Sequence, residues 1–228
     1  MQQDTPIKLP NPFPGLRPFT LDESHLFFGR EGQSETIVNY LSKYNFAAVT
    51  GASGSGKSSL IYCGVIPLLY GGFIAKAGTN WKVMAARPGS SPIWNLALAF
   101  SEAEANNQNT ENTTELQEFY YSLLNRHSLG IIDAIKQAYQ EDGSNLLLVI
   151  DQFEELFRYK DSRENQTEHR DDPNAFIKLL VNIVQQEEIP VYVVLTMRSD
   201  FVGDCSDYQE LTALINQSNY LVPQMTRE

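Results

Sequence analysis

The sequence predicts an α/β fold in which helices cover both faces of a parallel sheet, and three observations support this. Short apolar runs at residues 46–50 and 146–150 contain no breakers, as in strands that are buried on both faces. Segments with helical periodicity separate such runs, and alternation of strands and helices indicates parallel pairing. A glycine-rich phosphate-binding motif follows the first run and opens a helix, so the domain is predicted to be a P-loop NTPase.

Two regions are expected along the 228 residues. Residues 1–25 form an extended N-terminal segment, because proline recurs between positions 5 and 20 and cannot be accommodated inside a helix. Residues 26–228 form the P-loop core. Its expected strands are 46–50, 81–86, 146–150, 191–195 and 219–222. Its expected helices are 32–44, one that ends near 70, 92–104, 115–126, 129–140, 173–186 and 207–216. The polar stretch 105–114 and the charged stretch 159–173 are expected to be loops.

Residues 51–58 read Gly-Ala-Ser-Gly-Ser-Gly-Lys-Ser and fit the phosphate-binding pattern in full. Glycines let successive backbone N–H groups curl around an anion, and the helix that begins near Lys57 directs its positive end at the same place. The Lys57 ammonium suits the β- and γ-phosphates of ATP and the β-phosphate of ADP, and the Ser58 hydroxyl suits Mg²⁺. The residues expected to hold the nucleotide phosphates are Gly51, Ser53, Gly54, Ser55, Gly56, Lys57, Ser58 and Ser59.

An acidic group follows the clearest strand. Asp151 comes directly after residues 146–150, and the carboxyl ends of parallel strands line the ligand crevice, so Asp151 is predicted to hold Mg²⁺ together with Ser58. Glu154 and Glu155 follow within one turn, and either could orient or deprotonate an attacking water. The alternative for these two is a solvated helix start that complements the helix dipole.

A cation follows the strand at 191–195. Arg198 could reach a γ-phosphate if this strand neighbours the P-loop strand, which would distinguish triphosphate from diphosphate. The alternative is an ion pair with Asp200, Asp204 or Glu154.

Composition excludes several classes. The formal net charge of −11 argues against nucleic acid as the main partner. There is no apolar run of membrane-spanning length and no secretory signal, so no membrane partner is expected and a cytoplasmic location is predicted. Two cysteines far apart match no metal-binding spacing.

Taken together, several segments resemble one family. Residues 11–19 (NPFPGLRPF), residues 26–31 (LFFGRE), the P-loop (GASGSGKSSL), IDQFEELF and LTMRSDF are similar to the motifs of the novel STAND NTPases, bacterial signal-transduction ATPases related to the AAA+, NACHT and NB-ARC proteins. The likeness spans about residues 11–224. It implies an AAA+-like strand order 5-1-4-3-2 and a chain that lacks the helical lid and winged-helix regions of the family.

The resemblance also implies roles for particular residues. Phe28, Gly29 and Arg30 would lie beside the adenine base, and Arg198 would be a sensor arginine. AAA+ motors carry Glu directly after the strand-end Asp, whereas this chain has Gln152 there. This departure predicts slow hydrolysis.

Three functions remain open at this point. The first is an ATP-dependent signalling switch that controls self-association in response to an unknown protein or ligand trigger; by resemblance it would serve bacterial stress or anti-phage defence. The second is a constitutively active ATPase motor. The third is a nucleic-acid-acting AAA+ protein, which the acidic charge disfavours. ATP is preferred to GTP because no guanine-recognition motif is evident.

Overall fold

The computed structural model describes residues 15, 17–30, 32–108, 113–139, 143–158 and 172–224. At its centre is a five-stranded sheet in the order β2-β3-β4-β1-β5, and all neighbouring strands are parallel. The strands are β1 (Phe46–Gly51), β2 (Trp81–Ala86), β3 (Asn145–Ile150), β4 (Val191–Arg198) and β5 (Asn219–Leu221). The predicted fold class is confirmed, and so is the strand order, which reads 5-1-4-3-2 from the other edge.

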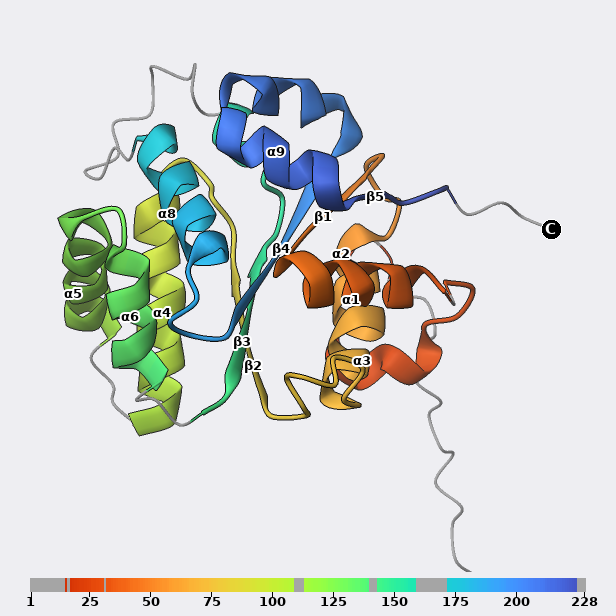
Figure 1. Ribbon diagram of the computed structural model, residues 1–228, viewed down its shortest axis with the longest axis horizontal. Helices are drawn as coiled ribbons and strands as arrows, with labels where there is room; N and C mark the ends of the chain where they lie inside the picture. Colours follow the sequence, from red (N-terminus) through yellow and green to blue (C-terminus); the bar gives the residue numbers. More distant parts are fainter. Residues whose placement is uncertain are drawn as a thin grey trace, which may run out of the picture.

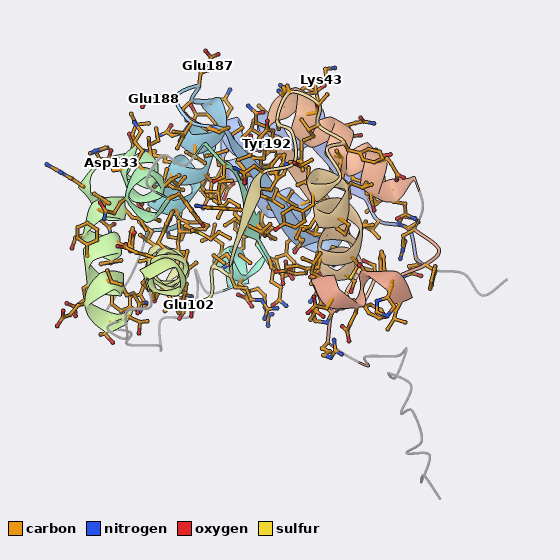
Figure 2. The ribbon with its side chains drawn as sticks, turned by 90° about the horizontal axis from the view of Figure 1, so that it is seen from below. Lys43, Glu102, Asp133, Glu187, Glu188 and Tyr192 are labelled. Atoms are coloured by element: carbon orange, nitrogen blue, oxygen red, sulfur yellow. The ribbon has the colours of Figure 1, made fainter. Side chains whose placement is uncertain are left out.

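Helices cover both faces of this sheet (Figure 1). One layer contains α4 (Pro92–Gln108), α5 (Thr113–Arg126), α6 (Gly130–Tyr139), α8 (Pro173–Gln185) and α9 (Gln209–Ser218). The other contains α1 (Gln33–Tyr44), α2 (Lys57–Leu60), the π-helix η2 (Ile61–Val65) and α3 (Ile66–Tyr70). The short α7 (Glu155–Arg158) and the 3-10 helices η1 (Leu21–Leu26) and η3 (Ser199–Asp207) complete the described elements. The layers are also visible from below (Figure 2).

The core is divided between the two faces of the sheet by the strand period of two. In β1, Phe46 and Ala48 pack in the cluster under α4, α6 and α8, whereas Ala47 and Val49 pack under α1 and α3. Every residue of β1 and β3 is buried, as expected for central strands of a doubly covered sheet. Packing on both faces therefore holds the carboxyl ends of both strands in place, and the phosphate loop and Asp151 follow directly after these ends.

Helix α4 is longer than the sequence analysis expects, since it continues through Gln108 and α5 already begins at Thr113. Both helices thus extend into the stretch 105–114 that was expected to be a loop. Polar composition alone therefore did not distinguish a loop from the ends of two helices in this stretch. Near its end α4 is held against α5 by the buried Tyr120 hydroxyl, which donates to the Glu104 carboxylate. Residues 109–112 and the middle of the charged stretch, 159–171, lie outside the described residues.

Residues 21–26 form η1 where the sequence analysis expects the end of an extended segment. A capping box explains this helix, because the Thr20 side chain and the Glu23 side chain each satisfy the other's backbone. Arg17 adds an ion pair to Glu23 at 2.6 Å. Residues 1–14 and 16, which hold most of the proline-rich stretch, lie outside the described residues.

None of the helices described here is long and apolar enough to cross a membrane.

Candidate functional site

The glycine-rich loop lies between β1 and α2, at the carboxyl edge of the sheet. Gly51 has no room for a side chain, because an added Cβ would lie 2.8 Å from Ser55 Oγ and 3.2 Å from the Val222 carbonyl oxygen. Gly54 and Gly56 adopt φ values of 73° and 86°, which side-chain-bearing residues rarely adopt. The local sequence therefore builds a loop whose main chain turns closely, as an anion cradle requires.

Lys57 begins α2 and folds back over the loop. Its Nζ donates to the carbonyl oxygens of Gly51 at 3.0 Å and Ala52 at 2.9 Å. Burial lowers the pKa of this ammonium, while the negative charges of Glu154 and Asp151 act to raise it. The cation thus lies over the loop and within the field of the acidic groups from β3.

Asp151 is the centre of the site. Its side chain is almost fully buried, at 5% exposure. Its Oδ1 accepts hydrogen bonds from Ser58 Oγ at 2.7 Å and from Thr196 Oγ1 at 2.6 Å. One carboxylate oxygen therefore connects the phosphate loop, β3 and β4. The predicted pairing of Asp151 with Ser58 is present, and Thr196, for which the sequence leaves a phosphate or water contact and a structural role open, donates to Asp151 here.

Arg87 occupies the other oxygen of this carboxylate. Its Nε and Nη2 lie 3.3 and 3.1 Å from Asp151 Oδ2. Sequence reasoning missed this residue, although a signal was present: Arg87 follows β2 as Asp151 follows β3 and Arg198 ends β4. The carboxyl ends of parallel strands meet at one edge, so a charged residue after β2 belongs to the same set.

Glu154 and Glu155 face different partners. Glu154 is 6% exposed, and its Oε2 accepts from the backbone N–H of Arg198 at 3.2 Å. Glu155 is less buried, and its Oε2 accepts from the backbone N–H of Gly89 at 3.1 Å. Glu154, and not Glu155, is among the acids whose charge acts on Lys57. Of the two carboxylates, Glu154 is therefore the one whose charge acts on the lysine of the phosphate loop.

Arg198 ends β4 next to Gly51, its register partner on β1. Its guanidinium is paired with Asp200, with Nη2 2.5 Å from Oδ2 and Nε 3.1 Å from Oδ1, and lies over the Phe201 ring. The ion-pair alternative from the sequence is the arrangement present here. The strand β4 nevertheless neighbours β1, which is the condition set for the γ-phosphate interpretation.

Arg30 lies against the phosphate loop. It is 5% exposed, and its guanidinium donates to the carbonyl oxygens of Ser55 at 2.7 Å and Pro223 at 2.8 Å. Phe28 is 71% exposed, and Gly29 has a φ of 79°. The structure thus brings Arg30 to the loop through carbonyl contacts and leaves the Phe28 ring accessible.

The serines of the motif differ in surroundings. Ser53 is exposed, whereas Ser55 is buried and its Oγ has no hydrogen-bond partner among the described protein atoms. Ser59 is also buried, and its Oγ accepts from the backbone N–H of Phe19 at 3.2 Å. Ser59 therefore anchors the N-terminal segment to the helix that follows the loop.

The oxygen ligands at this edge suit a hard cation. Ser58 and Asp151 place a hydroxyl and a carboxylate in direct contact, and these are the ligand types that Mg²⁺ prefers. Among the described residues there is no group of three or more His, Cys, Asp or Glu side chains that could hold a metal by itself. Mg²⁺ in phosphate-binding sites takes few protein ligands and the rest from phosphate and water, so the two residues fit that ion.

The fold agrees with comparisons to solved structures. The Walker-type ATPase PABY2304 of Pyrococcus abyssi superposes with a TM-score of 0.51 at 15% identity, over 91% of this chain and 56% of the ATPase. The ORC2 protein of Aeropyrum pernix, solved as ADPNP and ADP complexes, gives a TM-score of 0.54 at 11% identity, over 86% of this chain and 48% of ORC2. These identities establish the fold alone, and the chain spans about half the length of both proteins.

A search of curated proteins finds no match. Residues 12–228 match the sequence model of the family described as Novel STAND NTPase 1, which covers the P-loop, Asp151 and Arg198. The strand order, 5-1-4-3-2 from the β5 edge, is consistent with that of P-loop ATPases. The chain therefore belongs to the Novel STAND NTPase 1 family.

Proposed function

We propose that this chain is the ATP-binding switch domain of a STAND-type NTPase, which hydrolyses ATP slowly with Mg²⁺ and thereby controls self-association. The observation that carries the proposal is the 2.7 Å hydrogen bond between Ser58 Oγ and Asp151 Oδ1, beside a glycine-rich loop with Lys57 over it. A hydroxyl, a buried carboxylate and an ammonium around one turning main chain form a site for a metal-bound polyphosphate.

In this proposal the loop amides of residues 51–58 and the Lys57 ammonium bind the phosphates. Ser58 and Asp151 hold Mg²⁺, which supplies charge neutralisation between the β- and γ-phosphates. Lys57 Nζ would exchange its contacts with the Gly51 and Ala52 carbonyls for phosphate oxygens. Phe28, accessible at the surface, would pack against the base.

Slow turnover is supported by the surroundings of the acids. The residue after Asp151 is Gln152, which adopts a positive φ of 57° and donates its backbone N–H to Thr196 Oγ1. Glu154 and Glu155, the acids that could act on water, each accept a hydrogen bond from a backbone N–H. An amide in place of a carboxylate directly after Asp151 leaves no acid at that position to orient or deprotonate water, which favours a switch over a continuously active motor.

Nucleotide binding is tested by calorimetry. Wild-type protein is expected to bind Mg·ATP and Mg·ADP, and Lys57→Ala is expected to weaken both by about tenfold or more, the loss for one buried charged contact. Lys43→Ala, which removes an exposed lysine at the end of α1, is the matched control and should bind like wild type. Equal affinity of the Lys57→Ala variant and wild type would remove the basis of the proposal.

The switch and motor functions differ in turnover and assembly. A switch is expected to turn over far below the roughly 1–100 s⁻¹ of continuously active phosphoryl-transfer enzymes. Its mass, measured by light scattering, is expected to rise with ATP but not with ADP, because a nucleotide shifts an equilibrium only by its differential affinity for the two states. Fast hydrolysis with an unchanged mass would instead indicate a motor. Salt-dependent DNA binding would indicate the nucleic-acid function.

A further inference from the structure

Both oxygens of the Asp151 carboxylate accept hydrogen bonds, and the donors come from three segments of the chain. Oδ1 accepts two hydroxyl hydrogen bonds, from Ser58 and Thr196. Oδ2 accepts from Nε and Nη2 of Arg87. An ionised carboxylate this buried is costly unless a cation compensates it, and Arg87 supplies that cation here. The Lys57 ammonium donates to main-chain carbonyls instead.

We propose that Arg87 is a positioning residue that competes with Mg²⁺ for Asp151 and so sets the metal dependence of nucleotide binding. This inference rests on the proposed nucleotide function. Mg²⁺ and its bound water need the same carboxylate that the Arg87 guanidinium holds, and two cations at one carboxylate repel each other. Arg87 would therefore leave Asp151 when Mg²⁺ is bound and would return to the ion pair that keeps Asp151 in place when it is not.

Arg87 has space to move when released. Its side chain is 54% exposed, and it lines a cavity of about 730 Å³ beside the site. The cavity is bounded by the N-terminal segment, η2, the end of β2 and α4, and Asp151 forms part of its wall. Glu102, which extends from α4 as Figure 2 shows, lines the same cavity and offers a second carboxylate for the guanidinium.

Arg87 also connects the metal site to a candidate catalytic acid. Two residues further along the same loop, the Gly89 N–H holds Glu155. The loop after β2 therefore contacts Asp151 through the Arg87 side chain and Glu155 through the Gly89 backbone.

The test compares nucleotide affinity with and without metal. Arg87→Gln is expected to bind Mg·ADP about three- to tenfold more tightly than wild type, the effect of removing one partly exposed competing ion pair. Its affinity for ADP in excess EDTA is expected to stay within about twofold of wild type, since without metal there is no competition. A second readout is the affinity for Mn²⁺ measured by electron paramagnetic resonance with ADP present, which should rise in parallel.

Two further variants complete the design. Arg126→Gln removes the same charge from the exposed end of α5 and should leave both affinities unchanged. Arg87→Met keeps the aliphatic stem, so the result does not depend on the folding of a single variant.

Three outcomes would overturn the inference. The first is identical Mg²⁺ dependence in Arg87→Gln, Arg87→Met and wild type, with wild type still binding nucleotide; this leaves the proposed function intact. The second is a loss confined to a non-hydrolysable ATP analogue, which would make Arg87 a γ-phosphate ligand. The third is a wild-type protein that binds no nucleotide, which removes the proposed function and this inference together.

Discussion

The Lys57 ammonium and the Arg198 guanidinium, the two cations predicted to reach the phosphates, each contact a protein acceptor in this conformation. Lys57 contacts carbonyl oxygens of its own loop, and Arg198 contacts Asp200. The guanidinium of Arg198 also lowers the pKa of Asp200, which keeps that carboxylate ionised. Binding of a triphosphate would therefore have to exchange these contacts, and the affinity depends on the strength of the contacts that are lost.

The Arg198–Asp200 pair leads to a prediction on nucleotide selectivity. Arg198→Ala is expected to weaken ATP binding more than ADP binding, because only ATP carries the phosphate that the guanidinium would reach. Asp200→Asn is expected to have the opposite effect, with ATP affinity rising by about two- to fivefold because an exposed ion pair is worth little. Calorimetry with ADP and an ATP analogue measures both. Equal losses for the two nucleotides in Arg198→Ala would contradict a γ-phosphate role.

The two glutamates after Asp151 can be separated by single substitutions. Glu154→Gln is expected to lower steady-state hydrolysis by about tenfold or more while Mg·ATP still binds, since general-base groups contribute at least this much. Glu155→Gln is expected to change turnover less, because its contact is with the Gly89 N–H. Steady-state assays with excess radiolabelled ATP give the rates. A larger loss in Glu155→Gln would identify Glu155 as the base.

At the scale of elements, the helix after the phosphate loop contains a π-helical turn, η2, and a glycine explains its packing. An added Cβ at Gly64 would lie 2.0 Å from Ser34 Oγ and 3.1 Å from Ser34 Cβ, so α1 and η2 approach at this point without space for a methyl group. This contact is between residues distant in the sequence. Periodicity predicted the helix but could not predict its π turn or its partner.

This contact predicts the effect of a single methyl group. Gly64→Ala is expected to lower the free energy of unfolding by about 1–3 kcal/mol, the usual cost of overpacking. Ser34→Ala in the same background should recover part of the loss, because it removes the nearer of the two Ser34 atoms. Gly203→Ala, where nothing lies within 4 Å of an added Cβ, is the control and should change stability by less than about 1 kcal/mol. Chemical denaturation measures all three, and equal stability of the two glycine variants would contradict the close approach.

The sequence predicted the strands and the pairing of Asp151 with Ser58 for a shared reason. Buried runs and strand-end residues are local signals, and the parallel arrangement brings the strand ends to one edge. The role of Arg87 was missed because it depends on a carboxylate from another strand. The helix η1 was missed although its capping box, Thr20 with Glu23, is a local signal, because the nearby prolines were interpreted as extending through residue 25. The stretch 105–108 was misassigned because polarity was interpreted as a loop.

At the scale of the whole molecule, the N-terminal segment docks against the helix that follows the phosphate loop. The Phe19 N–H donates to Ser59 Oγ, and the Cys63 thiol donates to the Thr20 carbonyl oxygen at 3.1 Å. Cys205 is buried elsewhere, beside Met197. Each of the two free thiols therefore reports on a different part of the molecule.

Thiol labelling tests this docking. Burial raises the pKa of Cys63 to about 11 and that of Cys205 to about 12, so at pH 8 both are protonated and should react slowly with a disulfide reagent. Ser59→Ala is expected to accelerate labelling of Cys63, because the segment loses an anchor, and to leave Cys205 unaffected. Stopped-flow absorbance with peptide mapping distinguishes the sites. Labelling of wild-type Cys63 as fast as in the denatured chain would contradict the docked arrangement.

The two carbonyls held by Arg30 belong to parts of the chain that are 168 positions apart, Ser55 in the phosphate loop and Pro223 just beyond β5. A single rigid guanidinium therefore works as a mechanical link between them. A displacement of the backbone at Pro223 must therefore either lengthen one of these hydrogen bonds or displace the phosphate loop. A movement of the loop around an anion would act on the chain beyond β5 through the same two bonds.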